Sequence, residues 1–261
     1  MTLVQGCTLF LAALLGGALN AVAGGGSFLC FPALILSGAP SAAANMTSTV
    51  ALWPASLSSV SAYHTEIRGK RKEFLPVLAA SLLGGIIGAV VLVHLPGSTF
   101  EKFVPFLMLF ATLVFSLGRP LMQRFRQQVA ASGVKPGTSG IVAWFIQLLI
   151  AVYGGFFGGG IGMLMLALLT LQGMESIHQM NALKNLLSAC INGVAILIFV
   201  GVGGILWPQA AVMMLGGLLG GYAGASYARR INPAWIRLIV SICGFGITAL
   251  FFARAFSAGG I

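Results

Sequence analysis

The chain has 261 residues, of which 58% are hydrophobic and only 7% are charged. A soluble protein of this length needs more polar surface, so the composition predicts an integral membrane protein. The formal net charge of +10 would suit nucleic acid, but the basic residues form short clusters between apolar segments. That pattern is typical of membrane proteins with basic cytoplasmic loops, so we expect a lipid bilayer and no nucleic acid as partner.

Acidic residues are scarce, and none lies in the middle of an apolar segment. The sequence has no aspartate, and Glu66, Glu73, Glu101 and Glu175 all lie near segment ends. A cation carrier normally places a carboxylate inside the membrane, so a cation is a poor candidate for the substrate. The four cysteines have no metal-type spacing, and no phosphate-loop or dinucleotide motif occurs. We therefore expect no metal site and no cofactor.

Eight apolar segments follow one another along the chain, each long enough to cross a bilayer. They cover residues 8–36, 42–63, 73–95, 98–118, 139–171, 175–200, 206–228 and 233–253. The first and the fifth are distinctly longer, and each contains a run of three glycines, at 24–26 and at 158–160. Glycine runs remove the side-chain packing that supports a helix, so both segments are predicted to be broken or re-entrant there.

The two halves of the chain align at an offset of 134 residues (158 − 24), which places Thr47 on Asn181. The sequence therefore predicts an all-α membrane protein built from two repeats of four helical segments. The repeats need each other to bury their polar interiors, so residues 1–261 are expected to form one transporter domain. Its parts are repeat 1 at 6–120, a basic, loop-like cytoplasmic linker at 121–138, and repeat 2 at 139–255.

Two topologies distribute the basic residues differently. If all eight segments cross once, nine Lys and Arg residues lie on one side and four on the other, with Lys184 left out. If each glycine-broken segment dips in and returns, eleven face the cytoplasm and two lie outside. The second arrangement fits the positive-inside rule better and makes the halves inverted repeats. The single-crossing arrangement stays open, because the margin is two residues.

A polar helix start follows each glycine run. Asn45, Thr47 and Ser48 begin the helix in repeat 1, and Asn181, Lys184 and Asn185 share one face of the helix in repeat 2. Hydroxyl and amide side chains also serve as ordinary hydrogen-bonding groups between membrane helices. Lys184 lies inside an apolar segment without an obvious carboxylate partner, so it either snorkels to the interface or faces a cavity.

These features together predict a donor-rich, anion-selective site near the midplane. Broken helices offer free N–H groups with partial positive charge, and glycines let a substrate approach the backbone. His178 is a candidate for proton coupling, although a histidine in a first helical turn is more often interfacial. The predicted substrate-binding residues are Gly24, Gly25, Gly26, Ser27, Asn45, Thr47, Ser48, Gly158, Gly159, Gly160, Asn181, Lys184 and Asn185.

The ordered set of motifs resembles the TauE/SafE-type sulfite exporter family, also called the TSUP transporters. The set comprises Gly24-Gly25-Gly26 followed by Pro32, Asn45-x-Thr47-Ser48, Gly158-Gly159-Gly160 and Asn181-x-x-Lys184. The resemblance covers nearly the whole chain. The resemblance implies a multi-pass carrier of the cytoplasmic (inner) membrane. Such carriers move sulfur-containing anions, such as sulfite or organosulfonates, often outward. Ala44 before Asn45 departs from the family pattern, and the identity of the anion stays open.

We therefore predict a secondary transporter, not an enzyme, that exports a small sulfur-containing anion by alternating access between the halves. An anion channel is one alternative, and a polytopic membrane enzyme is another, although no nucleophile–base pair or metal-ligand set occurs. The expected partners are a small anionic substrate, the bilayer and a coupling proton or sodium ion. The direction, the coupling ion and the oligomeric state stay open.

Overall fold

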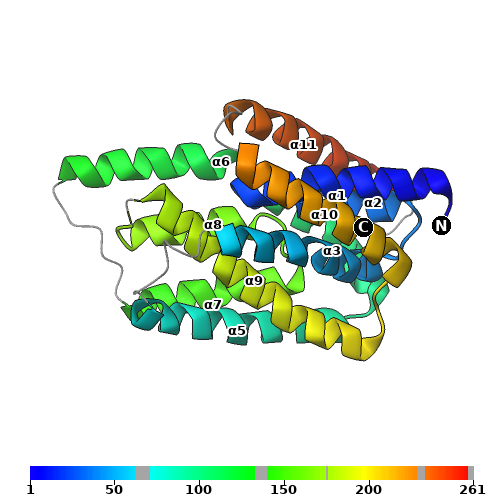
Figure 1. Ribbon diagram of the computed structural model, residues 1–261, viewed down its shortest axis with the longest axis horizontal. Helices are drawn as coiled ribbons and strands as arrows, with labels where there is room; N and C mark the ends of the chain where they lie inside the picture. Colours follow the sequence, from blue (N-terminus) through cyan, green and yellow to red (C-terminus); the bar gives the residue numbers. More distant parts are fainter. Residues whose placement is uncertain (63–70, 133–139, 175, 228–232, 258–261) are drawn as a thin grey trace.

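The computed structural model describes residues 1–62, 71–132, 140–174, 176–227 and 233–257 (Figure 1). This part of the chain is helical throughout and contains no strand, which confirms the predicted all-α class. The helices are α1 (Leu3–Ala23), α2 (Ser27–Leu36), α3 (Ser41–Ala62), α5 (Arg71–His94), α6 (Gly97–Ser132), α7 (Gly140–Phe156), α8 (Ile161–Leu171), α9 (Ile177–Val202), α10 (Trp207–Tyr227) and α11 (Pro233–Ser257). Each predicted apolar segment is found as a helix or as a broken pair of helices.

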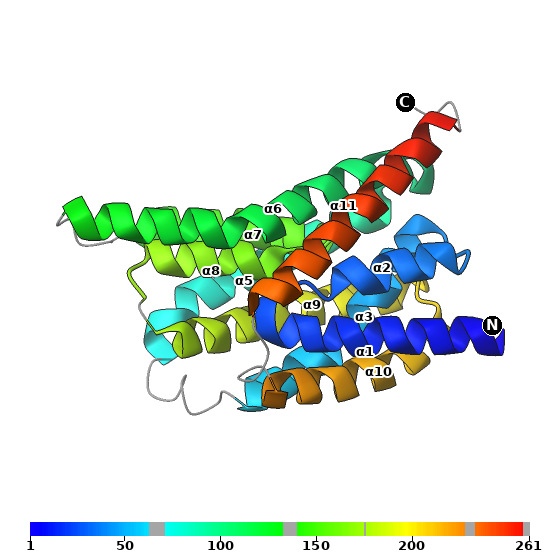
Figure 2. The same cartoon turned by 90° about the horizontal axis from the view of Figure 1, so that it is seen from above.

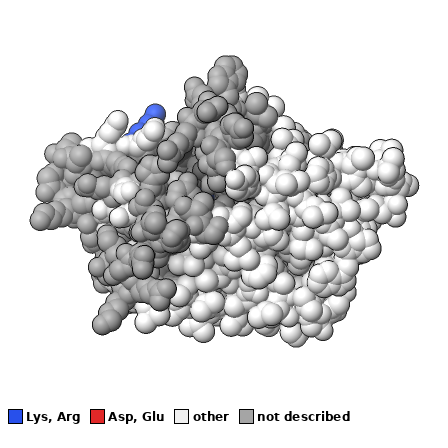
Figure 3. Space-filling model, viewed as in Figure 1, with Lys and Arg blue, Asp and Glu red and all other residues white. Residues whose placement is uncertain are grey.

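The outer surface is apolar, as a bilayer requires. Within the described ranges, four helical stretches are long and apolar enough to cross a membrane, namely Leu3–Ala21, Phe74–His94, Gly97–Gly118 and Gln179–Val202. Large apolar side chains such as Leu149 (69% exposed) and Leu197 (75% exposed) point outward. On the face in Figure 3, the described atoms are almost all uncharged, with basic atoms visible only towards one end. A water-soluble monomer rarely exposes so much apolar surface.

Both glycine runs break the helix and reverse the chain. Gly24 adopts a left-handed conformation (φ 74°) and ends α1, and α2 then runs back beside α1. The antiparallel pairing places Cys30 beside Ala12, with Sγ 3.8 Å from the carbonyl oxygen, while the Gln5 amide donates to the Ser37 carbonyl (3.4 Å). The first hairpin (α1 and α2) therefore begins and ends at the same end of the molecule (Figure 2).

The second glycine run does the same between α7 and α8. Gly158 (φ 78°) and Gly160 (φ 77°) are both left-handed, and the Tyr153 hydroxyl donates to the Gly159 carbonyl (2.8 Å) across the turn. Figure 1 shows α8 turning back beside α7. This second hairpin (α7 and α8) follows the same dip-and-return path as the first hairpin, so the predicted breaks are confirmed as chain reversals.

The helices of the two repeats are interlocked. The first hairpin packs along α10, and α5 packs along α7 (Figure 1), so each repeat holds the hairpin of the other. Both contacts depend on glycines that let backbones approach closely. Gly220 lies against the Leu14 carbonyl, and Gly84 lies against the Leu148 carbonyl. These positions correspond closely between the two repeats, because the leucines are separated by the repeat offset (148 − 14 = 134) and the glycines by two residues more (220 − 84 = 136). We call the contact of Gly220 with Leu14 the first glycine seam and the contact of Gly84 with Leu148 the second glycine seam.

The linker prediction is wrong for its first part. Residues 121–132 were expected to form a loop, but α6 continues to Ser132. After Pro120 this stretch contains no glycine or further proline, and its Leu, Met, Gln, Arg and Ala residues all favour helix. Polarity was mistaken for a loop signal. The rest of the linker, residues 133–138, lies outside the described residues.

Candidate functional site

The two hairpins meet at the centre of the molecule. A Cβ atom added to Gly24 would lie 2.9 Å from the Cα atom of Gly162, in the first turn of α8. Gly24 also needs its left-handed conformation, which other residues adopt only with strain. Glycine at this position therefore serves two purposes: it turns the chain, and it allows the first hairpin to touch the second.

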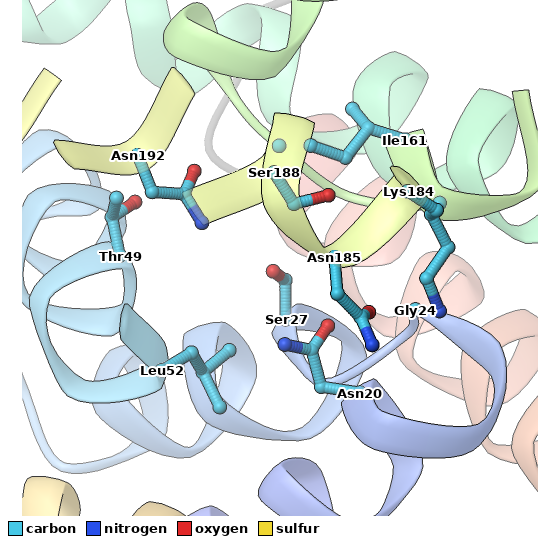
Figure 4. Close-up of a pocket in the computed structure, with 12 residues that line it drawn as sticks. Asn20, Gly24, Ser27, Thr49, Leu52, Ile161, Lys184, Asn185, Ser188 and Asn192 are labelled. Atoms are coloured by element: carbon cyan, nitrogen blue, oxygen red, sulfur yellow. The ribbon is translucent and has the colours of Figure 1, made fainter. Parts of the chain in front are cut away.

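A small polar cavity of about 20 Å³ lies beside this contact (Figure 4). It is enclosed by both hairpins together with α3 and α9, so it draws residues from both repeats. Most of its side chains can donate hydrogen bonds, and no carboxylate is among them. Its lining consists of Asn20, Gly24, Ser27, Thr49, Leu52, Gly158, Ile161, Gly162, Lys184, Asn185, Ser188 and Asn192.

Lys184 is the dominant electrostatic feature of the cavity. Its side chain is only 1% exposed, and its Nζ atom has no hydrogen-bond partner among the described residues. Figure 4 shows the side chain reaching from α9 towards Gly24, at the turn of the first hairpin. A buried ammonium group is strongly disfavoured unless an opposite charge or several acceptors compensate it. A negatively charged group beside Nζ would supply that compensation.

Amides extend the donor set around Lys184. Asn185 is 4% exposed, and its Nδ2 group has no hydrogen-bond partner among the described residues. Asn20 approaches from α1, and its Nδ2 group donates to the Ser56 hydroxyl at 3.1 Å. In Figure 4 the side chains of Asn20 and Asn185 lie close together beside Ser27. An oxyanion in the cavity would thus meet the Lys184 ammonium and neutral hydrogen-bond donors from the first hairpin and from α9.

Five of the predicted residues line the cavity, and the other glycines shape the turns around it. The five are Gly24, Ser27, Gly158, Lys184 and Asn185. Gly25 packs against the Phe115 ring and Gly26 against the Gly16 backbone, while Gly159 and Gly160 pack against Ala111. These four glycines do not line the cavity; they allow the turns to fit against α1 and α6.

Three predicted polar residues on α3 bind the protein itself. Asn45 Nδ2 donates to the Phe156 carbonyl at the end of α7 (2.8 Å), and the Thr47 hydroxyl accepts from the Leu206 N–H (3.0 Å). Ser48 donates to the Asn45 carbonyl within its own helix (2.9 Å). Asn45 and Thr47 therefore satisfy free backbone groups at helix ends, which the sequence alone did not show.

The two remaining predicted residues lie on α9. Asn181 is half-buried, and its Oδ1 atom has no hydrogen-bond partner among the described residues, but it does not line the cavity. His178 belongs to the first turn of α9, and its side chain lies outside what the structure describes.

Sequence reasoning missed four polar residues of the lining, which are Asn20, Thr49, Ser188 and Asn192. A signal for two of them was present, because Lys184, Ser188 and Asn192 are spaced by four residues along one face of α9. Asn20 lies one helical turn before Gly24, inside the first apolar segment.

The fold and the cavity define a multi-pass helical membrane protein with a buried lysine, Lys184, among its described residues. The chain matches the family model "Sulfite exporter TauE/SafE" over residues 9–251. It therefore belongs to the TauE/SafE sulfite exporter family, which confirms the resemblance, and it is a membrane transporter of that type.

Curated relatives agree with this assignment. The chain is 31% identical over 238 residues to the probable membrane transporter protein ORF9 of a Sinorhizobium species, covering 90% of this chain and 88% of that protein. It is 28% identical over 242 residues to a probable membrane transporter protein of Haemophilus influenzae, covering 92% of both. Identity to the probable membrane transporter protein YfcA of Escherichia coli K12 is 27% over 235 residues, covering 90% of this chain and 84% of that protein. No solved structure matches significantly.

Proposed function

We propose that this protein is a secondary transporter that exports a small sulfur-containing anion, sulfite or an organosulfonate, across the cytoplasmic membrane. The observation that carries the proposal is the buried Lys184 ammonium, which has no described partner and faces a donor-rich cavity between the two hairpins. The family description points to sulfite and to export. In this proposal the chain acts as one domain whose two repeats lie inverted in the membrane.

The size of the cavity supports a mechanism with conformational change. A volume of about 20 Å³ has room for one or two water molecules. A sulfur oxyanion is larger, so the hairpins must separate before it can bind. Alternating access would open the cavity first to one side of the membrane and then to the other.

The glycine seams suggest which parts move. Because α1 is locked to α10 and α5 to α7, we propose that one moving body comprises α1, α2, α3 and α10. The other comprises α5, α7, α8 and α9, and the cavity lies where the two bodies meet. This replaces the expectation that the sequence halves rock against each other, since the tightest contacts cross between the halves.

Spin-label distances can test these bodies. Leu11 on α1, Leu83 on α5, Leu149 on α7 and Leu215 on α10 are all exposed, so labelled cysteines fit there once the native cysteines are replaced. Pulsed electron–electron double resonance, measured with and without sulfite, should show constant distances between the spin labels at positions 11 and 215 and between those at positions 83 and 149. The Leu11–Leu83 distance should change. A constant Leu11–Leu83 distance with a changing Leu11–Leu215 distance would mean that the repeats themselves move.

The transport proposal is tested by flux into liposomes that contain the purified protein. Radiolabelled sulfite or methanesulfonate should enter with saturable kinetics, and unlabelled substrate inside should accelerate entry by counterflow. The Lys184→Met variant serves as the control for binding at the cavity. Absence of flux for every anion tested would reject transport.

Two alternatives predict different outcomes. An anion channel would give flux that does not saturate and no counterflow. A membrane enzyme would need an activated nucleophile, yet the Lys184 Nζ atom has no hydroxyl within hydrogen-bonding distance, so Ser27 and Ser188 lack an adjacent base. The cavity therefore favours binding and release over catalysis.

A further inference from the structure

We infer that the cavity is matched to a single negative charge, so that it accepts monoanions and rejects dianions of the same size. This inference rests on the proposed function and names the charge class of its substrate. It follows from the charges that surround the position beside Lys184.

Side chains supply one unit of positive charge to the cavity. Lys184 is the only ionisable residue of the described lining. Among the helices that pack against α9, the described parts of α3 and α8 contain no ionisable side chain. The Tyr153 hydroxyl of α7 donates a hydrogen bond to the Gly159 carbonyl. The ionisable residues of α5 all lie at its ends; they are Arg71, Lys72, Glu73 and His94.

The described side chains of the first hairpin and of α9 add no further charge to the cavity. Cys30 of α2 is buried, and its thiol lies against the Ala12 carbonyl. Cys7 lies in the first turns of α1, near the far end of the hairpin. On α9, Cys190 lies six residues after Lys184 and is absent from the lining. His178 lies six residues before Lys184, in the first turn of α9, and its side chain is outside what the structure describes.

Helix ends add almost nothing to this charge, because they cancel. The N-termini of α2 and α8 reach the cavity through Ser27 and Ile161, and each contributes roughly +0.5 charge. The C-termini of α1 and α7 reach it through Gly24 and Gly158, and each contributes roughly −0.5 charge. A glycine break always brings one end of each kind together. The net charge at the cavity is therefore close to that of Lys184 alone.

A monoanion therefore forms a neutral complex, whereas a dianion leaves one negative charge uncompensated in an apolar interior. Methanesulfonate and hydrogen sulfite carry one negative charge, while sulfate and fully ionised sulfite carry two. Sulfite would enter the site with its proton attached. Proton movement would then accompany sulfite transport without any protein carboxylate in the cavity.

Methanesulfonate and sulfate provide a matched pair of probes, because both place oxygens tetrahedrally around sulfur and differ chiefly in charge. Calorimetric titration of the wild-type protein in nanodiscs should show methanesulfonate binding at least about 100-fold more tightly than sulfate, equivalent to about 2.8 kcal/mol. Sulfate binding as tight as methanesulfonate binding would overturn the inference and leave the proposed transport of anions intact.

A pH series with sulfite gives an independent test. Sulfite loses its second proton near neutral pH, so its affinity should fall about tenfold per pH unit above that point. Methanesulfonate does not titrate there, so any change in its affinity reports titration of the protein, and the ratio of the sulfite to the methanesulfonate affinity isolates the effect of the sulfite proton. Sulfite affinity that stays constant or rises with pH would overturn the inference. Failure of all three anions to bind would reject the inference together with the proposed function.

Discussion

Replacing Lys184 with methionine is expected to weaken anion binding at least about 100-fold while raising the stability of the empty protein. A charge-assisted contact inside a desolvated site is worth about 2–5 kcal/mol when one partner is removed. Methionine has a similar length but no charge, so it removes the buried ammonium without leaving a large void. In the empty protein, loss of an uncompensated charge should stabilise the fold by about 1–3 kcal/mol. Calorimetric titration with methanesulfonate and thermal unfolding measure the two effects.

The opposite signs make this variant informative. A lysine that only supported the fold would lower stability when removed, and a lysine that did nothing would leave both quantities unchanged. Lys102→Met is the matched control, because Lys102 is exposed on α6 and should affect neither binding nor unfolding. Retained affinity in Lys184→Met would remove Lys184 from the site.

Gly220→Ala is expected to destabilise the protein by about 3 kcal/mol or more. A Cβ atom at this position would overlap the Leu14 carbonyl oxygen, and both neighbours are helical backbone that cannot rotate away. Overpacking of a tight interface typically costs about 1–3 kcal/mol, and overlap with backbone lies at the upper end. The loss should appear as a lower melting temperature and a smaller monodisperse fraction in size-exclusion chromatography.

Gly246→Ala provides the comparison for that variant. Gly246 lies in α11, and an added Cβ atom there would meet no atom within 4 Å. Because alanine favours helix over glycine by about 1 kcal/mol, this change should leave the melting temperature unchanged or raise it. Equal melting temperatures for Gly220→Ala and Gly246→Ala would show that the first glycine seam has no role in stability.

The sequence predicted local features of the fold well, because they depend on neighbouring residues. Apolar runs marked the helices, and the glycine runs marked the two chain reversals. The packing of α1 against α10 was not predicted, because a glycine indicates that another helix can approach closely but does not identify that helix. The helical continuation of α6 was missed for a different reason, since polar residues that favour helix look like a linker beside so many apolar segments.

The sequence predicted some residues of the site and missed others, because local sequence does not show which side chains meet in three dimensions. Lys184 stood out because an isolated charge in an apolar segment has few explanations. Asn45 and Asn20 are the same type of residue, yet Asn45 binds a helix end and Asn20 lines the cavity. Their sequence surroundings do not distinguish these roles, because the role depends on which backbone groups lie opposite in three dimensions.

The first glycine seam also has a consequence for biosynthesis. Leu14 in α1 leaves the ribosome 193 residues before Trp207, where its partner helix α10 begins (207 − 14). The close contact between α1 and α10 can therefore form only after those residues have been made. Until then, the small residues of α1 that contact α10 face lipid. We therefore expect α1 to reach its final packing late in biosynthesis, when α10 enters the membrane.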